Sequence, residues 1–181
     1  MLRMEGLTKF FGGLAAVADV DLDVNQGEIL GLIGPNGAGK STVMNMIAGT
    51  LRPSAGRLIF QGEEITNLPP HRIAARGISR VFQSNTLFHN LSVVTNVRIG
   101  LHLHSGIRFW GAFLNLSYVQ RREGSLRKEA YEILKFVGLS GQEEQLAVNL
   151  PHGNQRILCL AVALAVKPVL LLLDEPMTGM N

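Results

Sequence analysis

The sequence reads Gly34-Pro35-Asn36-Gly37-Ala38-Gly39-Lys40-Ser41-Thr42 between two apolar runs, residues 28–33 and 43–49. This order predicts a strand, a glycine-rich turn and a helix. The three glycines let successive backbone N–H groups point toward one place, and the helix that begins near Lys40 directs the positive end of its dipole there. Lys40 adds a full charge for the β- and γ-phosphates of a nucleotide, and Ser41 offers a hydroxyl to Mg²⁺. A simple glycine-rich turn gives no reason for Lys-Ser-Thr at this offset, so the stretch is predicted to be a phosphate-binding loop, or P-loop.

The composition indicates one globular domain. The chain has 181 residues, of which 46% are apolar and 17% charged, and this length is enough for a sizeable core. The net charge of +3 is too small to indicate nucleic acid as a partner. The single cysteine, Cys159, excludes an internal disulfide and suits a reducing compartment. The first residues lack an apolar signal region, and Lys167-Pro168 interrupts the longest apolar stretch, residues 157–173, so we expect any membrane role to come through a partner.

Residues 2–10 and 17–24 are expected to be strands, because Val20, Leu22 and Val24 alternate with aspartates in the pattern of a half-exposed antiparallel strand. The stretch between them is Phe10-Phe11-Gly12-Gly13. Its aromatic residues could pack in the core or offer a flat surface on which a base stacks. The residues alone favour the core, and the phosphate-binding loop downstream favours stacking.

Turn and capping residues divide the rest of the chain into shorter elements. We expect a hairpin at residues 57–65, a helix at 71–76, a strand at 78–82 ending at Gln83, a helix from an N-cap at Ser92 to about His102, and an amphipathic helix from Ser125 to Val137. Residues 104–124 carry several apolar side chains. They are expected to form the core of a helical subdomain, with an exposed docking surface as the alternative.

An apolar helix at residues 157–166 is followed by an apolar run at 169–173, the pattern of a central parallel strand buried on both faces. Asp174 and Glu175 come next, at the end where open α/β sheets place their sites. Asp174 could hold Mg²⁺, directly or through water, opposite Ser41, and Glu175 could act as general base on an attacking water. Ordinary strand-end solvation is the alternative, but the phosphate-binding loop upstream favours the catalytic pair.

The order and spacing of these motifs resemble the nucleotide-binding subunits of ABC transporters over nearly the whole chain. The matching segments are Walker A at Gly34–Thr42, the Q-loop at Gln83, a signature-type segment at Leu150–Arg156, Walker B at Leu170–Glu175 and a D-loop-like stretch at Gly179–Asn181. The resemblance implies an α/β fold of the ABC-type P-loop NTPase class, with a mixed sheet core, N-terminal antiparallel β strands and a helical subdomain. Residues 1–181 would be a single ATP-binding domain, with 1–90 and 150–181 as the catalytic core and 91–149 as the helical subdomain.

The resemblance also implies roles for single residues, with ATP and Mg²⁺ as cofactors. Phe11 would stack on adenine, with Val17 beside it. Gln83 would contact Mg²⁺ or the attacking water, and Glu175 would be the catalytic base. The metal-binding residues would be Ser41, Gln83 and Asp174.

The signature-type segment implies a second subunit. Pro151, His152, Gly153 and Asn154 would cap the γ-phosphate of ATP bound to the opposite subunit, from a helix N-terminus. ATP would join the two subunits head to tail, and its hydrolysis would release them. Pro151 and His152 stand where many ABC proteins have Ser-Gly, so a serine hydroxyl is missing. The backbone N–H groups near Gly153 and the His152 side chain are the remaining donors.

Within the family, residues 82–88, the insertion at 104–124 and residues 149–156 are similar to ATP-binding proteins of branched-chain amino acid importers, with urea and short-chain amide importers as close alternatives. This implies a position on the cytoplasmic face of the cell membrane, peripheral through transmembrane permease subunits, and an indirect link to a solute-binding protein. No nucleic acid is expected. A soluble ABC ATPase of translation or DNA repair, and a nucleotide-binding fragment without hydrolysis, are the alternative functions. A kinase or GTPase is disfavoured by the signature and Walker B segments.

The family carries a switch histidine after the D-loop, whereas no histidine follows His152 here. We therefore expect the last part of the ABC core to be missing from this chain. The full-length protein is expected to hydrolyse ATP to ADP and phosphate. The present chain is expected to bind MgATP poorly and to hydrolyse it slowly or not at all.

Overall fold

The computed structural model describes residues 1–81, 87–102 and 117–174. They belong to two compact units, Met1–Ile78 and Ser79–Asn181. Several predictions lie outside the described residues: those for Gln83, for Glu175, for the D-loop-like stretch and for residues 103–116 of the expected subdomain core.

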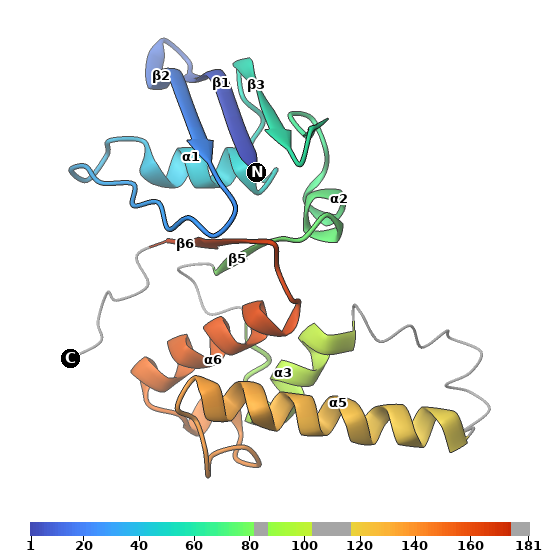
Figure 1. Ribbon diagram of the computed structural model, residues 1–181. Helices are drawn as coiled ribbons and strands as arrows, with labels where there is room; N and C mark the ends of the chain where they lie inside the picture. Colours follow the sequence, from blue (N-terminus) through green and yellow to red (C-terminus); the bar gives the residue numbers. More distant parts are fainter. Residues whose placement is uncertain (82–86, 103–116, 175–181) are drawn as a thin grey trace. The chain divides into compact units, whose positions relative to one another are not determined.

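The first unit contains a sheet with the strand order β2-β1-β3-β4 (Figure 1). The strands are β1 (Leu2–Phe11), β2 (Leu14–Val24), β3 (Ala55–Phe60) and β4 (Glu63–Glu64), and every neighbouring pair is antiparallel. The two expected N-terminal strands are confirmed, although β2 begins at Leu14 rather than at residue 17. The expected hairpin at residues 57–65 is also confirmed, as β3 and β4.

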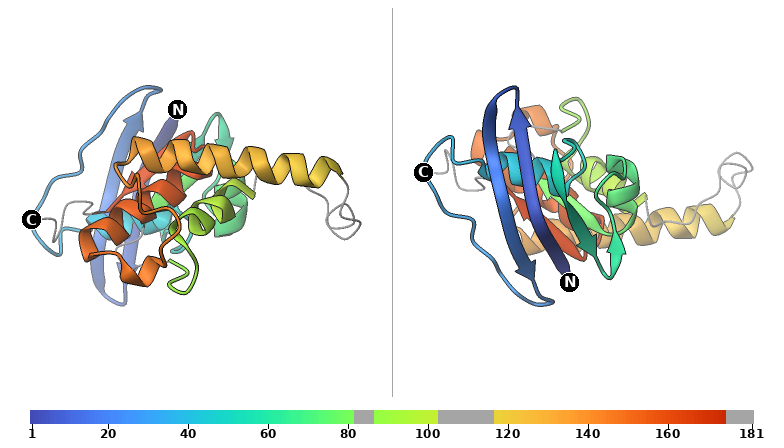
Figure 2. Two further views of the ribbon diagram at one scale, coloured as in Figure 1. Left: turned by 90° about the horizontal axis from the view of Figure 1, so that it is seen from below. Right: turned by 90° about the horizontal axis from the view of Figure 1, so that it is seen from above.

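One face of this sheet is covered by helix α1 (Lys40–Ile47), and the short helix α2 (Pro70–Ala75) lies at the β3 side of the unit (Figures 1 and 2). Alternate positions of the strands supply the core, because successive side chains of a strand point to opposite faces. Met4, Leu58 and Met46 are fully buried there. The aspartates that alternate with Val20, Leu22 and Val24 are exposed, as the sequence pattern predicts.

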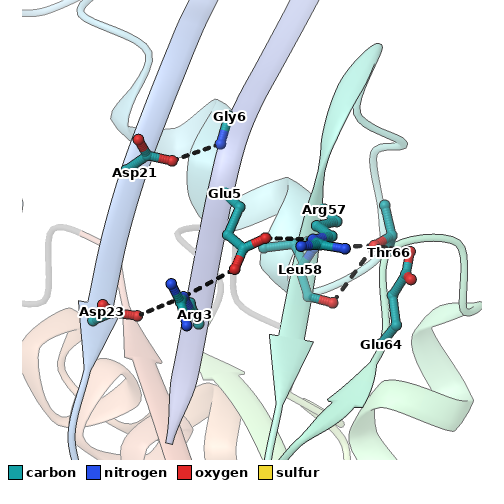
Figure 3. A network of polar contacts seen from close by, with 9 residues as sticks. All are labelled: Arg3, Glu5, Gly6, Asp21, Asp23, Arg57, Leu58, Glu64 and Thr66. Carbon is teal, nitrogen blue, oxygen red and sulfur yellow. Dashed lines mark hydrogen bonds and ion pairs between the residues drawn. The ribbon is translucent and has the colours of Figure 1, made fainter.

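A network of ion pairs links the side chains of neighbouring strands (Figure 3). Glu5 on β1 pairs with Arg57 on β3 and, at 3.0 Å, with Arg3, whose guanidinium also lies 3.7 Å from Asp23 on β2. The hydrogen bond to Glu5 raises the pKa of Arg57 above its ordinary value. Exposed pairs of this kind contribute at most about 1 kcal/mol each, so burial of the opposite face sets the register of the sheet.

The strand predicted at residues 28–33 is not formed. Within the described part of the chain no strand pairs with this segment, and the side chains of Ile29 and Ile33 are 99% and 96% exposed. A segment forms a β-strand only where its backbone N–H and C=O groups pair with those of a neighbouring strand. The prediction of a strand before the P-loop is therefore wrong for this structure, whereas the turn and the helix after it are confirmed.

The second unit packs three helices around one core: α3 (Val93–His102), α5 (Ser117–Phe136) and α6 (His152–Ala165). Val97, Leu134 and Leu158 are completely buried in it. Helices α3 and α6 approach closely at Gly100, where an added Cβ would lie 2.8 Å from the carbonyl oxygen of Val162. The 3-10 turn η1 (Ala147–Asn149) leads into α6. No helix of the described residues is long and apolar enough to cross a membrane.

Helix α5 begins earlier than predicted, whereas α3 begins where it was predicted. Helix α5 begins at Ser117 rather than Ser125. A glycine such as Gly124 costs about 1 kcal/mol inside a helix, and the pairing of Glu123 with Arg98 of α3 helps to offset this cost. The expected N-cap of α3 is confirmed, since the backbone N–H of Thr95 donates to the hydroxyl of Ser92 at 3.3 Å.

Strands β5 (Ile78–Val81) and β6 (Leu170–Leu173) form a two-stranded sheet. Among the described residues β6 pairs with β5 alone, and Val169 and Leu173 are exposed. The prediction of a strand buried on both faces is wrong here, because a strand is buried in this way only where other elements cover both faces of its sheet.

Candidate functional site

The P-loop is shaped by two glycines in the left-handed region. Gly37 and Gly39 have φ angles of 83° and 82°, which side chains with a Cβ rarely adopt. The N–H of Ala38 donates to the carbonyl of Pro35 at 3.2 Å. The N–H of Val43 donates to the carbonyl of Gly39 at 2.9 Å and forms the first helical turn of α1. The loop therefore turns sharply and leads directly into α1.

The N-terminus of α1 fits an anion. Within the described residues, no side chain caps Gly39, and the first turn of α1 contains no acidic residue. The positive end of the helix is therefore not neutralised by a carboxylate of its own turn. Such an end is the usual place for a phosphate group, and phosphate binding by the loop and the helix stays a prediction.

Lys40 spans the loop. Its ammonium group donates to the carbonyl of Gly34 at 2.7 Å and to the carbonyl of Pro35 at 2.8 Å. These bonds hold the ammonium group beside the turn, so the side chain does not extend into solvent. The ammonium group is thus ordered beside the carbonyls at the start of the loop, and its contact with a phosphate stays a prediction.

Strand β2 forms one wall of the loop. An added Cβ on Gly39 would lie 2.3 Å from the carbonyl oxygen of Ala16 and 3.1 Å from Cγ2 of Val17. Val17 is 6% exposed. Its side chain therefore supports the loop, and contact with a base remains a prediction.

The aromatic pair in the β1–β2 turn is exposed. The side chains of Phe10 and Phe11 are 48% and 50% exposed, so packing in the core, which the residues alone favoured, is wrong. Lys9 lies over the ring of Phe11, with its nitrogen 5.4 Å from the ring centroid, and donates to the carbonyl of Arg52 at 2.7 Å. Phe11 thus offers an accessible aromatic face, as stacking on a base requires.

Asp174 lies directly after β6 and forms an ion pair with Arg80 of β5. The guanidinium Nη2 donates to Oδ2 of Asp174 at 3.0 Å, and the two side chains are only 8% and 9% exposed. Sequence reasoning missed Arg80. The available signal was a lone basic residue between Ile78 and Val81 in a predicted strand, since a basic side chain that is buried there requires an acidic partner.

The signature-type segment forms the start of α6. Pro151 is the N-cap residue, and the helix begins at His152, five residues before the predicted helix at 157–166. The side chain of Gln155 turns back to donate to the carbonyl of Leu150 at 2.9 Å. Asn154 donates to the side chain of Gln142 at 3.0 Å. Sequence reasoning assigned no role to Gln155 or Gln142, which fix the first turn of α6.

These residues fall into two groups. The P-loop, Val17 and Phe11 belong to the first unit, whereas Asp174, Arg80 and the signature-type segment belong to the second. Each group is locally ordered by the contacts described above. Pro151 and His152 are exposed, so the start of α6 is accessible to another molecule.

The comparisons with known proteins show the family of the chain. The family model described as ABC transporter matches residues 17–178. The chain is 38% identical over 181 residues to the high-affinity branched-chain amino acid transport ATP-binding protein BraF of Pseudomonas aeruginosa, covering 100% of this chain and 71% of that protein.

Solved structures give the same result. The ADP conformation of MJ1267, an ATP-binding cassette of an ABC transporter, is similar with a TM-score of 0.81 and 32% identity, covering 100% of this chain and 70% of that one. The dimeric post-hydrolysis state of the ATP-binding cassette MJ0796, bound to ADP and Pi, is similar with a TM-score of 0.82 and 26% identity, covering 100% of this chain and 76% of that one.

Proposed function

This chain belongs to the ABC transporter family and has the ABC-type P-loop NTPase fold, and on that premise we propose that it couples ATP binding and hydrolysis to the uptake of branched-chain amino acids or similar small polar solutes. The family makes it an ATP-binding subunit of a transporter. The observation that carries the proposal is the P-loop, in which the left-handed Gly37 and Gly39 lead into the uncapped start of α1 and Lys40 is held beside them. The solute class is inferred from the similarity to BraF.

The residues present fit a nucleotide with Mg²⁺. The P-loop backbone, the start of α1 and Lys40 would bind the phosphates, and Phe11 would stack on the base. Ser41 and Asp174 would be ligands of Mg²⁺, since hydroxyl and carboxylate oxygens are the ligands it prefers. When bound, Mg²⁺ would supply positive charge to the terminal phosphates.

Two predicted catalytic residues, Gln83 and Glu175, lie outside the described residues and keep their proposed roles. Glu175 follows Asp174 directly, and as general base it would take a proton from the attacking water. Gln83 would orient that water or contact the metal. Hydrolysis would then give ADP and phosphate.

The proposed assembly contains two such subunits. The exposed start of α6, with residues 151–154, would meet the γ-phosphate of ATP held by the other subunit, so that each site is completed by its partner. The dimeric cassette MJ0796 bound to ADP and Pi supports this arrangement. We propose that residues 1–90 and 150–181 form the catalytic core and residues 91–149 the helical subdomain.

The proposed location is the cytoplasmic face of the cell membrane, through permease subunits and with an indirect link to a solute-binding protein. A soluble ABC ATPase is the second candidate, and a nucleotide-binding fragment without hydrolysis is the third. Co-purification separates the first two. Association with a hydrophobic permease supports transport, whereas association with ribosomes or DNA refutes it.

The proposal is tested by binding of a fluorescent ATP analogue with Mg²⁺ to the full chain, followed by the same measurement on Glu175→Gln. This substitution removes the proposed base but keeps the side-chain volume, so in the full-length protein, which is expected to hydrolyse ATP, the variant should retain ATP and not turn it over. Loss of ATP retention in Glu175→Gln would count against Glu175 as base. Absence of nucleotide binding in the unaltered chain would overturn the proposed function itself.

A further inference from the structure

The ion pair between Arg80 and Asp174 joins residues that are 94 positions apart in the sequence. The pairing of β5 with β6 brings them together, since Arg80 lies within β5 and Asp174 directly follows β6. Both side chains are more than nine-tenths buried, and the guanidinium donates to the carboxylate at 3.0 Å. By contrast, the ion pairs on the first sheet lie at its surface.

A buried ion pair has a specific energetic character. Taking either charge out of water is unfavourable, and the attraction between them compensates only when both are present and well aligned. If one partner is removed, the other is left as an uncompensated buried charge. Asp174 is therefore satisfied without a metal, and Arg80 supplies the positive charge that a buried carboxylate at this position needs.

We propose that Arg80 is the counter-charge of Asp174 in the nucleotide-free protein, and that Mg²⁺ has to compete with it for the carboxylate when nucleotide binds. The proposal rests on the proposed function, in which Asp174 holds Mg²⁺. Arg80 is a positioning residue, because it acts on the metal through Asp174 and does not contact the nucleotide. A positive charge next to the carboxylate weakens its attraction for a second cation. Arg80 thereby raises the Mg²⁺ concentration at which the site fills.

The test measures thermal unfolding of the full chain with a saturating, non-hydrolysable ATP analogue, first in EDTA and then along a Mg²⁺ titration. Arg80→Met should lower Tm by several degrees in EDTA, because Asp174 is left without its counter-charge. Mg²⁺ should restore most of this loss by binding the folded form. The Mg²⁺ concentration for half-maximal stabilisation should fall about tenfold.

Two further variants separate charge from packing. Arg80→Lys keeps the positive charge and should keep the Mg²⁺ midpoint close to that of the unaltered chain. Arg98→Met breaks a different ion pair of the second unit, with Glu123. It should lower Tm and leave the Mg²⁺ midpoint unchanged.

A midpoint for Arg80→Met equal to or above that of the unaltered chain would overturn the proposal and leave Arg80 as a structural tie between two strands. If Arg80→Met does not fold in EDTA, recovery of folded protein in about 10 mM Mg²⁺ with the analogue supports the proposal, and failure to recover overturns it. If the unaltered chain does not bind the analogue at all, both the inference and the proposed function are overturned. If the unaltered chain binds the analogue and responds to Mg²⁺, but the variants have the same Mg²⁺ midpoint as the unaltered chain, only the inference is overturned.

Discussion

Gly39 lies against the backbone of Ala16, so closely that a Cβ added to Gly39 would be 2.3 Å from the Ala16 carbonyl oxygen. Strand β2 and the P-loop are therefore in direct backbone contact within the first unit. The contact explains why the loop keeps its shape although the segment before it, residues 28–33, is not held in a sheet. The antiparallel hairpin, and not a preceding strand, supports the phosphate-binding turn.

Gly39→Ala should be clearly more destabilising than Gly37→Ala. Both glycines have nearly the same left-handed φ, 82° and 83°, so both substitutions carry about 1–2 kcal/mol of backbone strain. Of these two, Gly39 has a backbone neighbour within 4 Å of its added Cβ, and Gly37 has none among the described residues; displacing that backbone should add about 1–3 kcal/mol. Urea unfolding of the two variants measures the difference. Equal losses of unfolding free energy in the two variants would mean that the backbone of β2 shifts at little cost and does not shape the loop.

Lys40→Met should weaken nucleotide binding with little effect on stability. Charge-assisted hydrogen bonds contribute about 1.5–3 kcal/mol, so the affinity for a fluorescent ATP analogue should fall at least about tenfold. The bonds of Lys40 to Gly34 and Pro35 lie at an exposed site, and the free energy of unfolding should change by less than about 1 kcal/mol. Lys135→Met, at an exposed position of α5, is the control and should leave binding unchanged. Unchanged affinity in Lys40→Met would show that the loop does not bind the phosphates.

The parts of the fold that were predictable from the sequence are those whose cause is local. The alternation of Val20, Leu22 and Val24 with aspartates depends only on one buried face, and it correctly gave β2. The glycine and lysine spacing of the P-loop depends on backbone conformation and on the start of a helix, and both are present. Ser92 caps α3 because the hydroxyl and the N–H of Thr95 are only three residues apart.

The parts that failed depend on neighbours distant in the sequence. An apolar run such as residues 28–33 or 169–173 is compatible with a buried strand, but its burial is set by strands that must pair with it. Arg80 was missed for the same reason, because its role depends on the ion pair with Asp174, which directly follows β6. For Phe10 and Phe11 the residues alone favoured the core over stacking on a base, whereas both side chains are exposed near the turn of the β1–β2 hairpin.

Acid should destabilise the protein partly through Glu144. The hydroxyl of Tyr131 and the guanidinium of Arg127 both donate to Glu144 Oε1 at 2.6 Å, and these bonds lower the pKa of Glu144 below its ordinary value. A lowered pKa in the folded state stabilises the protein above the unfolded-state pKa, and this stabilisation is lost as pH falls through the folded-state pKa.

The fall of Tm between about pH 5 and pH 3 should therefore be less steep in Glu144→Gln than in the unaltered chain. The effect should be small, because the groups are exposed. Glu132→Gln, at an exposed position of α5, the helix that also carries Tyr131 and Arg127, is the control. An equal slope in Glu144→Gln and the unaltered chain would contradict the prediction.

Asn96→Ala should destabilise the second unit and reduce ATP hydrolysis more than ATP binding. Asn96 is 2% exposed. Its Oδ1 accepts from the N–H of Phe88 at 2.9 Å, while its Nδ2 donates to the carbonyls of Phe88 at 3.1 Å and Ser92 at 3.0 Å. One side chain thus fixes the backbone of Phe88 to the start of α3. Leaving these backbone groups unsatisfied should cost about 2–4 kcal/mol in urea unfolding.

Asn96→Asp provides the comparison for this prediction. It keeps an acceptor for the N–H of Phe88 but loses both donated bonds and buries a carboxylate, so it should be at least as destabilising as Asn96→Ala. Thr95→Ala removes only the contact between two hydroxyls, Thr95 with Ser92, and should cost about 1 kcal/mol or less. If the proposed role of Gln83 is correct, the turnover of MgATP by the full-length protein should fall in the Asn96 variants while the affinity for the nucleotide changes little, because the P-loop lies in the other unit. Equal losses of affinity and turnover would mean that Asn96 acts only through global stability.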